Sequence, residues 1–303
     1  MWKKMEEVYI KARGKVNLNL EILDKRQDNY HNLKSVFQKI SLYDEMLIKK
    51  IKNNKLELQT NIESLNNSDN IIYKAYEKLK QRYKTITGVS VILNKRIPMQ
   101  AGLGGGSTDC ASFIIAINKL FDLNLTKQEI IDIGKSLGAD VVPCLYNTAV
   151  IGEGIGDVIT KIKTDYKYYL VIIKPNISCS TKELFKILDD NKHREIIDKT
   201  DEIVKALQKK DIKSIAKNLF NRFEYVMPDK EIFQNIKKEL MVNGAIGASM
   251  TGSGSCVFGI FENKQLAKKA YKSIKQKHEA YYCISYNSQK EEMFWKIIKK
   301  LQQ

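Results

Sequence analysis

Long hydrophobic runs and paired cysteines are absent from this sequence. No segment of its 303 residues approaches the roughly 18 apolar residues that span a bilayer, and the first six residues form no apolar signal region. The five cysteines lie far apart, at positions 110, 144, 179, 256 and 283, which predicts free and mostly buried thiols. These absences predict a cytoplasmic protein without a membrane partner.

The basic residues are not gathered into a patch with aromatic residues. Lysine and arginine number 51 against 35 acidic residues, which gives a formal net charge of +16. The lysines are spread along the chain, whereas single-stranded nucleic acid is bound by a basic groove with stacking aromatic rings. We therefore expect no nucleic-acid partner. A positive field of this size favours the capture of anionic nucleotides instead.

The segment 98–109, P-M-Q-A-G-L-G-G-G-S-T-D, is the most informative part of the sequence. Four glycines within residues 102–106 leave the backbone free to adopt positive φ and to approach a ligand closely. Apolar residues then recur at 110, 113, 114, 117, 120 and 121, which indicates a helix that begins at this segment. Because a helix N-terminus presents free N–H groups, the segment predicts a binding site for a polyphosphate.

The better-known glycine motifs do not match this segment. A P-loop has a lysine between its last glycine and the serine or threonine, but here Ser107 follows Gly106 directly. The dinucleotide-binding and protein-kinase motifs require a glycine where Ser107 stands. A different class of nucleotide-binding protein is therefore indicated.

Further motifs lie in a fixed order along the chain. K-V-N-L at 15–18 belongs to an alternating strand, so that Lys15 and Asn17 share a face, although this pattern alone fits a solvated face equally well. L-G-A-D-V at 137–141 contains Asp140. Taken alone, this residue fits a carboxylate that caps a turn as well as it fits a functional carboxylate. The other motifs are D-N-Y-H at 28–31, S-L-Y-D at 41–44, E-G-I-G at 153–156, S-T at 180–181 and M-T-G-S-G at 250–254.

The segment 98–109 closely resembles the second motif of the GHMP kinases. The ordered motifs, over about residues 8–260, resemble those members that phosphorylate the 2-hydroxyl of methylerythritol linked to cytidine diphosphate, in the non-mevalonate route to isoprenoid precursors. The resemblance implies an α+β, two-domain GHMP kinase fold. A ribosomal-protein-S5-like domain at 1–160 would bind ATP, a ferredoxin-like domain would follow at 161–303, and the substrate would bind between them.

The same resemblance implies the roles of individual residues. Asp140 would accept the proton of the acceptor hydroxyl, and Lys15 would keep Asp140 ionised and stabilise charge on the transferring phosphoryl group. ATP and Mg²⁺ would be the cofactors, with Ser107 as a metal ligand. The predicted ATP-binding residues are Asn70, Lys95, Pro98, Met99, Ala101, Gly102, Leu103, Gly104, Gly105, Gly106, Ser107 and Thr108.

The predicted substrate site contains two aromatic residues. Tyr30 and Phe185 would sandwich the cytosine, and His31 would bind its hydrogen-bonding edge. Phe185 equally fits the core of a helix at 181–188. Thr181 would help to hold the diphosphate, and the remaining predicted substrate residues are Asn17, Gly252 and Gly254.

Two other hypotheses stay open. One is a GHMP kinase that acts on another small alcohol of the homoserine or mevalonate type. The other is a non-catalytic nucleotide-binding or nucleic-acid-binding protein; the intact Lys15 and Asp140 oppose it. Arg13 and Gly14 keep it open, because they replace the family's Pro-Ala and add a cation where Lys15 must be positioned. A monomer and a homodimer are both compatible with the sequence.

The remaining pattern predicts the elements around these motifs. Thr126 and Glu129 form a capping box at the start of a helix that Gly138 ends. Other helices are expected at 69–83 and, rich in lysine, around 289–301. Strands are expected near 8–23, 34–49, 56–60, 89–93, 148–152 and 168–173.

Overall fold

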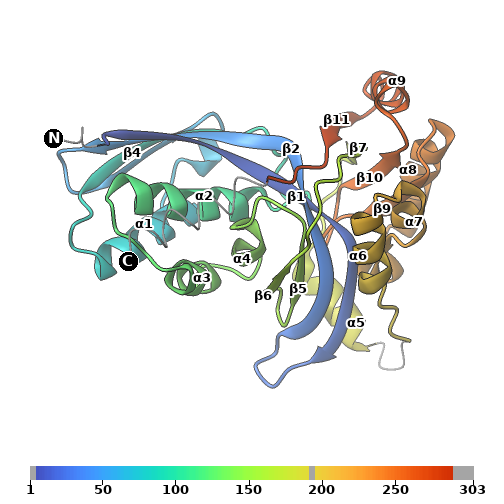
Figure 1. Cartoon of the computed structure of the whole chain (residues 1–303), viewed down its shortest axis with the longest axis horizontal. Helices are drawn as coiled ribbons and strands as arrows, with labels where there is room; N and C mark the ends of the chain where they lie inside the picture. The colour runs from blue at the N-terminus through green and yellow to red at the C-terminus, as the bar shows by residue number, and fades with distance from the viewer. Residues whose placement is uncertain (1–4, 191–194, 289–303) are drawn as a thin grey trace.

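The computed structural model describes residues 5–190 and 195–288. Two sheets lie beside each other, with helices on their faces (Figure 1). In the described residues the larger sheet has seven strands, in the order β3-β4-β2-β1-β8, with β5 beside β2 and β6 beside β5. These strands are β1 (Glu7–Lys25), β2 (His31–Ile51), β3 (Leu56–Thr60), β4 (Gly88–Asn94), β5 (Val150–Glu153), β6 (Val158–Lys161) and β8 (Phe220–Asn221).

The smaller sheet is antiparallel, with the order β11-β7-β10-β9. The four inner residues of strand β7 (Tyr169–Lys174) are all buried, because both faces of this strand are covered: Leu170 and Ile172 share a core with β1, and Val171 and Ile173 belong to a second core. The other strands are β9 (Gly247–Met250), β10 (Val257–Phe261) and β11 (Glu279–Ile284).

Helix α2 (Gly105–Leu120) is the central helix of the first half of the chain. Eleven of its sixteen residues are buried, because it packs against β1 and β2 on one side and against other helices around it. The helices that contact it are α1 (Ile71–Arg82), α3 (Lys127–Lys135) and α4 (Val141–Cys144), and the short η1 (Glu63–Leu65) precedes α1 in the chain. The first turn of α2 is thereby fixed at the middle of the molecule.

The second half of the chain places helices around the smaller sheet. Helices α8 (Lys230–Val242) and α9 (Lys264–Ile274) contact its strands, and their apolar faces contribute to its core. The other helices are α5 (Thr181–Asp190), α6 (Thr200–Lys209), α7 (Ile212–Lys217) and the short η2 (Arg222–Tyr225).

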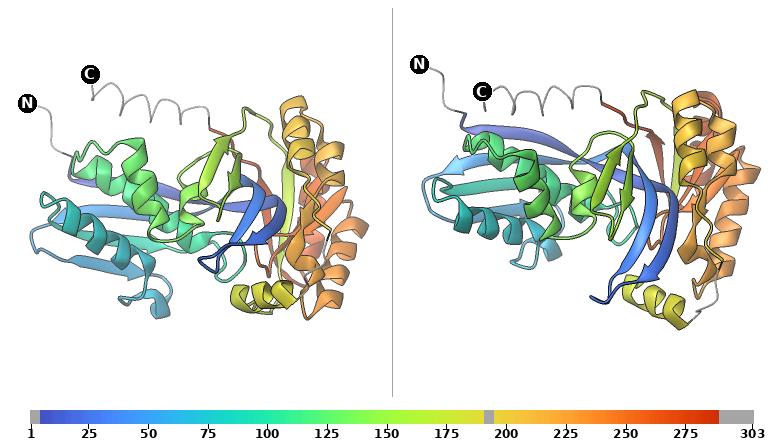
Figure 2. Two further views of the ribbon diagram at one scale, coloured as in Figure 1. Left: turned by 90° about the horizontal axis from the view of Figure 1, so that it is seen from below. Right: turned by 60° about the horizontal axis from the view of Figure 1, so that its bottom comes forward.

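The long β1–β2 hairpin joins the two halves. Its strands have 19 and 21 residues, and both views of Figure 2 show it reaching from the helices of the first half to the second sheet. Val16 and Leu18 of β1 share a core with Ile172 of β7, while Met46 and Ile48 of β2 pack in the core around α2. The hairpin therefore fixes the two halves relative to each other.

Several expectations from the sequence are confirmed. The Thr126–Glu129 capping box is present at the start of α3, the helix expected at 69–83 is α1, and the five cysteines are free, four of them buried. No helix among the described residues is long and apolar enough to cross a membrane. The lysine-rich helix expected around 289–301 lies outside the described residues.

Arg13 does not add a cation to the site of Lys15, contrary to expectation. The register of β1 on β2 shifts between these residues, so that Arg13 pairs with Tyr43 and Lys15 with Lys39. The Arg13 guanidinium lies 3.7 Å from the ring centroid of Tyr286 and 5.2 Å from that of Tyr43. The Arg13 guanidinium donates to the carbonyl oxygen of Ser41, whereas the Lys15 ammonium donates to Asn17 and Gly102, so the bulge turns the two cations toward different surroundings.

A buried ion pair connects β1 to η2. The Arg222 guanidinium donates to both carboxylate oxygens of Glu21, at 2.7 and 2.6 Å, and the backbone N–H of Ile197 donates to the same carboxylate at 2.6 Å. Glu21 is fully buried. Its charge is therefore compensated by these donors rather than by water.

We predict that Arg222→Met destabilises the protein by about 3–5 kcal/mol, because the Glu21 carboxylate is left buried without its cation. Arg26→Met is the matched control: it removes an exposed pair with Asp28 and should cost less than about 1 kcal/mol. Urea denaturation of both variants measures the difference. Equal losses would contradict the assigned importance of the buried pair.

Candidate active site

Two cavities meet between the two halves of the chain. The smaller cavity, of about 460 Å³, is lined by the glycine loop, defined here as residues 98–107. The larger cavity, of about 850 Å³, is lined by β1, β2 and α5. Four residues line both cavities and so mark their junction: Lys15, Asp140, Gly252 and Ser253.

The glycine loop ends at the N-terminus of α2, as predicted. Gly102 and Gly104 adopt left-handed conformations, with φ of 71° and 68°. A Cβ on Gly102 would lie 1.9 Å from the carbonyl oxygen of Thr251, so this glycine also permits a close approach of two backbones. Gly105 begins the helix and does not need positive φ. The sixteen-residue helix thus presents its free N–H groups at the smaller cavity.

The structure brings the predicted ATP-binding residues together, with one exception. Asn70, Lys95 and the predicted residues from Pro98 to Ser107 all line the smaller cavity. Thr108 does not line it. The Thr108 side chain is buried, donates to the carbonyl oxygen of Arg13 at 2.7 Å and accepts from Lys39 at 3.1 Å. Thr108 therefore fastens α2 to β1, which its place in the motif could not reveal.

Lys95 belongs to a buried cluster of three charged groups beneath the glycine loop. Its ammonium donates to one oxygen of Asp44 and, at 2.6 Å, to one oxygen of Asp109. The other oxygen of Asp44 accepts from the backbone N–H of Ile97 at 2.8 Å. Lys95 is a predicted ATP-binding residue and lines the smaller cavity, and its ammonium is held there by two carboxylates. Sequence reasoning assigned no role to either Asp44 or Asp109.

Asp109 carries the least favourable charge of this cluster. Burial raises the pKa of its carboxyl to about 8, because the neighbouring Lys95 ammonium offsets only part of the desolvation. Its second oxygen is buried and has no hydrogen-bond partner among the described residues. With this raised pKa, Asp109 holds its proton near neutral pH and adds no negative charge beside Lys95.

We predict that the stability of the wild type relative to Asp109→Asn decreases as the pH rises from about 5 to 8. The native state retains a proton on Asp109 in this window, whereas the unfolded chain loses it near pH 4, so the free energy of unfolding of the wild type falls with pH. Urea denaturation at several pH values measures this trend. Asp165→Asn, which changes an exposed carboxylate, is the control: the stability of the wild type relative to this variant should not change with pH above about pH 5. Parallel curves for the wild type and Asp109→Asn would refute the raised pKa of Asp109.

Lys15 and Asp140 lie together at the junction of the cavities, as predicted. The Lys15 ammonium is 3.6 Å from an oxygen of Asp140 and donates to Asn17 at 2.8 Å and to the carbonyl oxygen of Gly102 at 3.0 Å. Lys15 is buried, whereas 48% of the Asp140 side chain is exposed. Asp140 precedes α4 but makes no side-chain capping bond to it. An accessible carboxylate beside a fixed cation suits proton abstraction from a hydroxyl next to a transferring anionic group.

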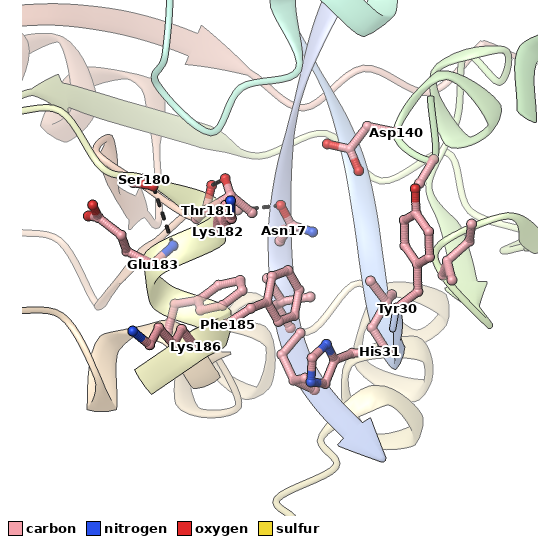
Figure 3. Close-up of a pocket in the computed structure, with 18 of the residues that line it drawn as sticks. Asn17, Tyr30, His31, Asp140, Ser180, Thr181, Lys182, Glu183, Phe185 and Lys186 are labelled. Atoms are coloured by element: carbon pink, nitrogen blue, oxygen red, sulfur yellow. Dashed lines mark hydrogen bonds between the residues drawn. The ribbon is translucent and has the colours of Figure 1, made fainter. Parts of the chain in front are cut away.

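The larger cavity collects most of the predicted substrate residues. Asn17, Tyr30, His31, Thr181, Phe185 and Gly252 line it, whereas Gly254 lies in a neighbouring hollow. In the view of Figure 3, Asp140 lies at the upper end and His31 and Phe185 lie toward the lower end. The Thr181 hydroxyl, at the start of α5, lies 2.6 Å from that of Ser253.

The aromatic residues of the larger cavity make contacts with one another that the sequence did not predict. His31 stacks on Phe185, with ring centroids 4.6 Å apart, and Phe185 also meets the edge of Phe223. Nε2 of His31 lies 2.6 Å from the Asp189 carboxylate, a partner that the sequence analysis missed. Tyr30 is 59% exposed, and its ring stacks on no other aromatic ring among the described residues. Phe185 therefore packs partly as a core residue, and Tyr30 presents the free ring.

Comparison with known proteins agrees with this geometry. Residues 70–148 match the GHMP kinases N terminal domain, and residues 203–280 match the GHMP kinases C terminal family. A 4-diphosphocytidyl-2-C-methyl-D-erythritol kinase of Alkaliphilus oremlandii is 38% identical over 289 residues, which cover 93% of this chain and 98% of that protein. The chain belongs to the GHMP kinases. The kinase of the same name from Acetivibrio thermocellus is 40% identical over 273 residues, 89% of this chain and 96% of the relative.

Solved structures show that this GHMP kinase has the two-domain fold of its family. A crystal structure of 4-(cytidine 5'-diphospho)-2C-methyl-D-erythritol kinase matches with a TM-score of 0.79 and 24% identity, covering 93% of this chain and all of that one. The mevalonate kinase of L. major in complex with R-mevalonate matches with a TM-score of 0.75 and 18% identity, covering 95% and 99%. GHMP kinases use ATP, and the smaller cavity has the loop and helix N-terminus that its phosphates need.

Proposed function

We propose that this protein transfers the γ-phosphoryl group of ATP to the 2-hydroxyl of 4-diphosphocytidyl-2-C-methyl-D-erythritol, a step of non-mevalonate isoprenoid precursor synthesis. One observation carries the proposal: Lys15 and Asp140 lie where a cavity with a phosphate-binding loop meets a larger cavity. The names of the relatives, at 38% and 40% identity over most of the chain, support this acceptor.

The proposed chemistry assigns a task to each side of the junction. Asp140 accepts the proton of the 2-hydroxyl as its oxygen attacks the γ-phosphorus and the bond to the β-phosphate oxygen breaks. The Lys15 ammonium stabilises the negative charge on the transferring group. Backbone N–H groups at the start of α2 bind the ATP phosphates.

Mg²⁺ belongs to this proposal as the partner of ATP. The described residues contain no cluster of three or more histidine, cysteine or carboxylate ligands. Mg²⁺ prefers oxygen ligands and commonly binds through substrate phosphates with few protein groups, which fits the Ser107 hydroxyl at the wall of the smaller cavity. Ser107 would hold the ion, which when bound would neutralise phosphate charge.

The larger cavity supports an acceptor that carries a nucleotide. At about 850 Å³ it has far more room than homoserine or mevalonate requires. Tyr30 offers an exposed ring for stacking on cytosine, with His31 and Phe185 nearby. In this proposal Thr181 and Gly252 bind the diphosphate part of the acceptor.

We further propose a domain boundary near residue 160, a cytoplasmic location, and a monomer or homodimer.

A phosphotransfer assay with the purified protein tests the acceptor. Incubation with ATP, Mg²⁺ and each candidate alcohol should give rapid ADP formation with 4-diphosphocytidyl-2-C-methyl-D-erythritol and little with galactose, homoserine or mevalonate. Equal or faster turnover of any of the other three would overturn the assignment. Turnover of none of the four would indicate a non-catalytic or differently specific protein.

We predict that Asp140→Asn and Lys15→Ala each lower turnover by at least about a hundredfold, because both groups act on the atoms being transferred. The apparent affinity for ATP should change little. Asp165→Asn and Lys210→Ala are matched controls from an exposed ion pair outside both cavities, and should keep normal turnover. Near-normal turnover of Asp140→Asn would exclude this residue as the base.

We predict that Tyr30→Ala weakens binding of the cytidyl substrate by about 1–3 kcal/mol, the usual contribution of one stacked base, while ATP affinity stays unchanged. Calorimetric titration of each ligand measures both effects. Tyr225→Ala is the control, because this tyrosine is similarly exposed, at 55%, but lies outside both cavities. Parallel losses for substrate and ATP would indicate a folding defect and remove Tyr30 from the site.

A further inference from the structure

Asn17 lies at the wall of the larger cavity, but its amide oxygen is already occupied. It accepts from the Lys15 ammonium at 2.8 Å and from the backbone N–H of Gly252 at 3.0 Å, and the Thr251 hydroxyl lies 3.3 Å from it. The Asn17 amide nitrogen donates to the Ser35 hydroxyl at 2.8 Å, and the residue is only 1% exposed. A carbonyl oxygen has two lone pairs, so the Lys15 ammonium and the Gly252 N–H already occupy both and leave none for a substrate hydroxyl.

Thr251 connects the same groups from the second half of the chain. Its hydroxyl accepts from the backbone N–H of Asn17 at 3.1 Å and lies within hydrogen-bond distance of two acceptors, the Asn17 amide oxygen and the carbonyl oxygen of Gly102. The Lys15 ammonium donates to these two acceptors as well. Thr251 is fully buried and lines neither cavity. It therefore touches the partners of Lys15 without access to either ligand.

The packing around this network leaves Lys15 little freedom. A Cβ on Gly252 would lie 3.3 Å from the Lys15 ammonium and 3.0 Å from the carbonyl oxygen of Gly102, so only a glycine allows these segments to approach so closely. A Cβ on Gly104 would lie 3.1 Å from Cε of Lys15. The ammonium is thus enclosed by β1, the glycine loop and the 251–252 segment.

We propose that Asn17 and Thr251 are positioning residues that hold the Lys15 ammonium at the junction of the cavities, and that Asn17 is not a substrate ligand. Both acceptors of Lys15 in the network are neutral oxygens, so they fix the ammonium without neutralising its charge. Asp140, at 3.6 Å, is the carboxylate within 4 Å of this ammonium in the described part of the chain. The charge of Lys15 therefore remains directed at Asp140 and at the group being transferred.

This proposal rests on the proposed function for its kinetic readout, and it differs clearly from the substrate-ligand alternative. A positioning residue acts on the transition state, so its loss lowers kcat and leaves KM for the acceptor unchanged. A substrate ligand that binds ground state and transition state equally raises KM for the acceptor when it is lost.

The decisive pair of variants is Thr251→Val and Thr251→Ser. Valine keeps the shape but removes the hydroxyl, and serine keeps the hydroxyl. We expect Thr251→Val to lower kcat at least about tenfold with both KM values within about twofold of wild type, and Thr251→Ser to stay within about threefold in kcat. Crystal structures of the two variants should show the Lys15 ammonium displaced from Asn17 with valine and retained with serine.

Two outcomes would overturn the proposal. One is a normal kcat in a folded Thr251→Val protein, and the other is a lowered kcat with the Lys15 ammonium still in its wild-type position. The crystal structures show the position of Lys15 whichever alcohol the protein phosphorylates. They therefore test the positioning role even if the acceptor assignment fails. That assignment fails separately, when the wild type does not phosphorylate 4-diphosphocytidyl-2-C-methyl-D-erythritol.

Asn17→Asp gives a second test that does not depend on Thr251. The aspartate keeps the size of the side chain but places a second carboxylate about 2.8 Å from the Lys15 ammonium, in competition with Asp140. We expect kcat to fall at least about tenfold with KM for the acceptor unchanged. A raised KM with unchanged kcat would identify Asn17 as a substrate ligand and overturn the proposal.

Discussion

The structure depends on keeping one buried ammonium, that of Lys15, charged and fixed at a seam between two halves of the chain. A buried cation is costly unless oxygen atoms replace its water, and here Asn17 and Gly102 supply them. These acceptors come from segments 85 residues apart, and the 251–252 segment packs on both. The long β1–β2 hairpin and the left-handed Gly102 are needed because both bring distant backbones to this point.

The cavities on either side of the seam suit two anionic ligands. The N-terminus of α2 lies at the smaller cavity and the start of α5 lies at the larger one, so the positive end of a helix dipole lies at each cavity. Charges that would disturb these sites are paired in the interior: Lys95 lies between Asp44 and Asp109, and Arg222 compensates Glu21. The excess of positive charge over the whole chain adds a general attraction for phosphates.

Local patterns predicted local features well. The glycine loop, the start of α2 and the capping box of α3 depend on residues within a few positions of one another, and all three are present. A pair that depends on long-range contact could be predicted only where each of its members belongs to a recognisable family motif, as Lys15 and Asp140 do. The sequence did not predict that Thr108 and Gly254 lie outside the two cavities, or that Lys95 is bonded to carboxylates. The environment of these residues is set by segments far away in the sequence. The stacking of His31 on Phe185 depends on how α5 docks on the hairpin, for which no local signal exists.

The central claim is that phosphoryl transfer occurs at the junction marked by Lys15 and Asp140. A crystal structure of the protein with a non-hydrolysable ATP analogue and 4-diphosphocytidyl-2-C-methyl-D-erythritol tests it most directly. The account predicts the 2-hydroxyl oxygen at about 2.6–3.2 Å from the Asp140 carboxylate and about 3–3.5 Å from the γ-phosphorus, with the triphosphate on the glycine loop. A triphosphate outside that loop, or an acceptor hydroxyl separated from Asp140 by the body of the substrate, would contradict it.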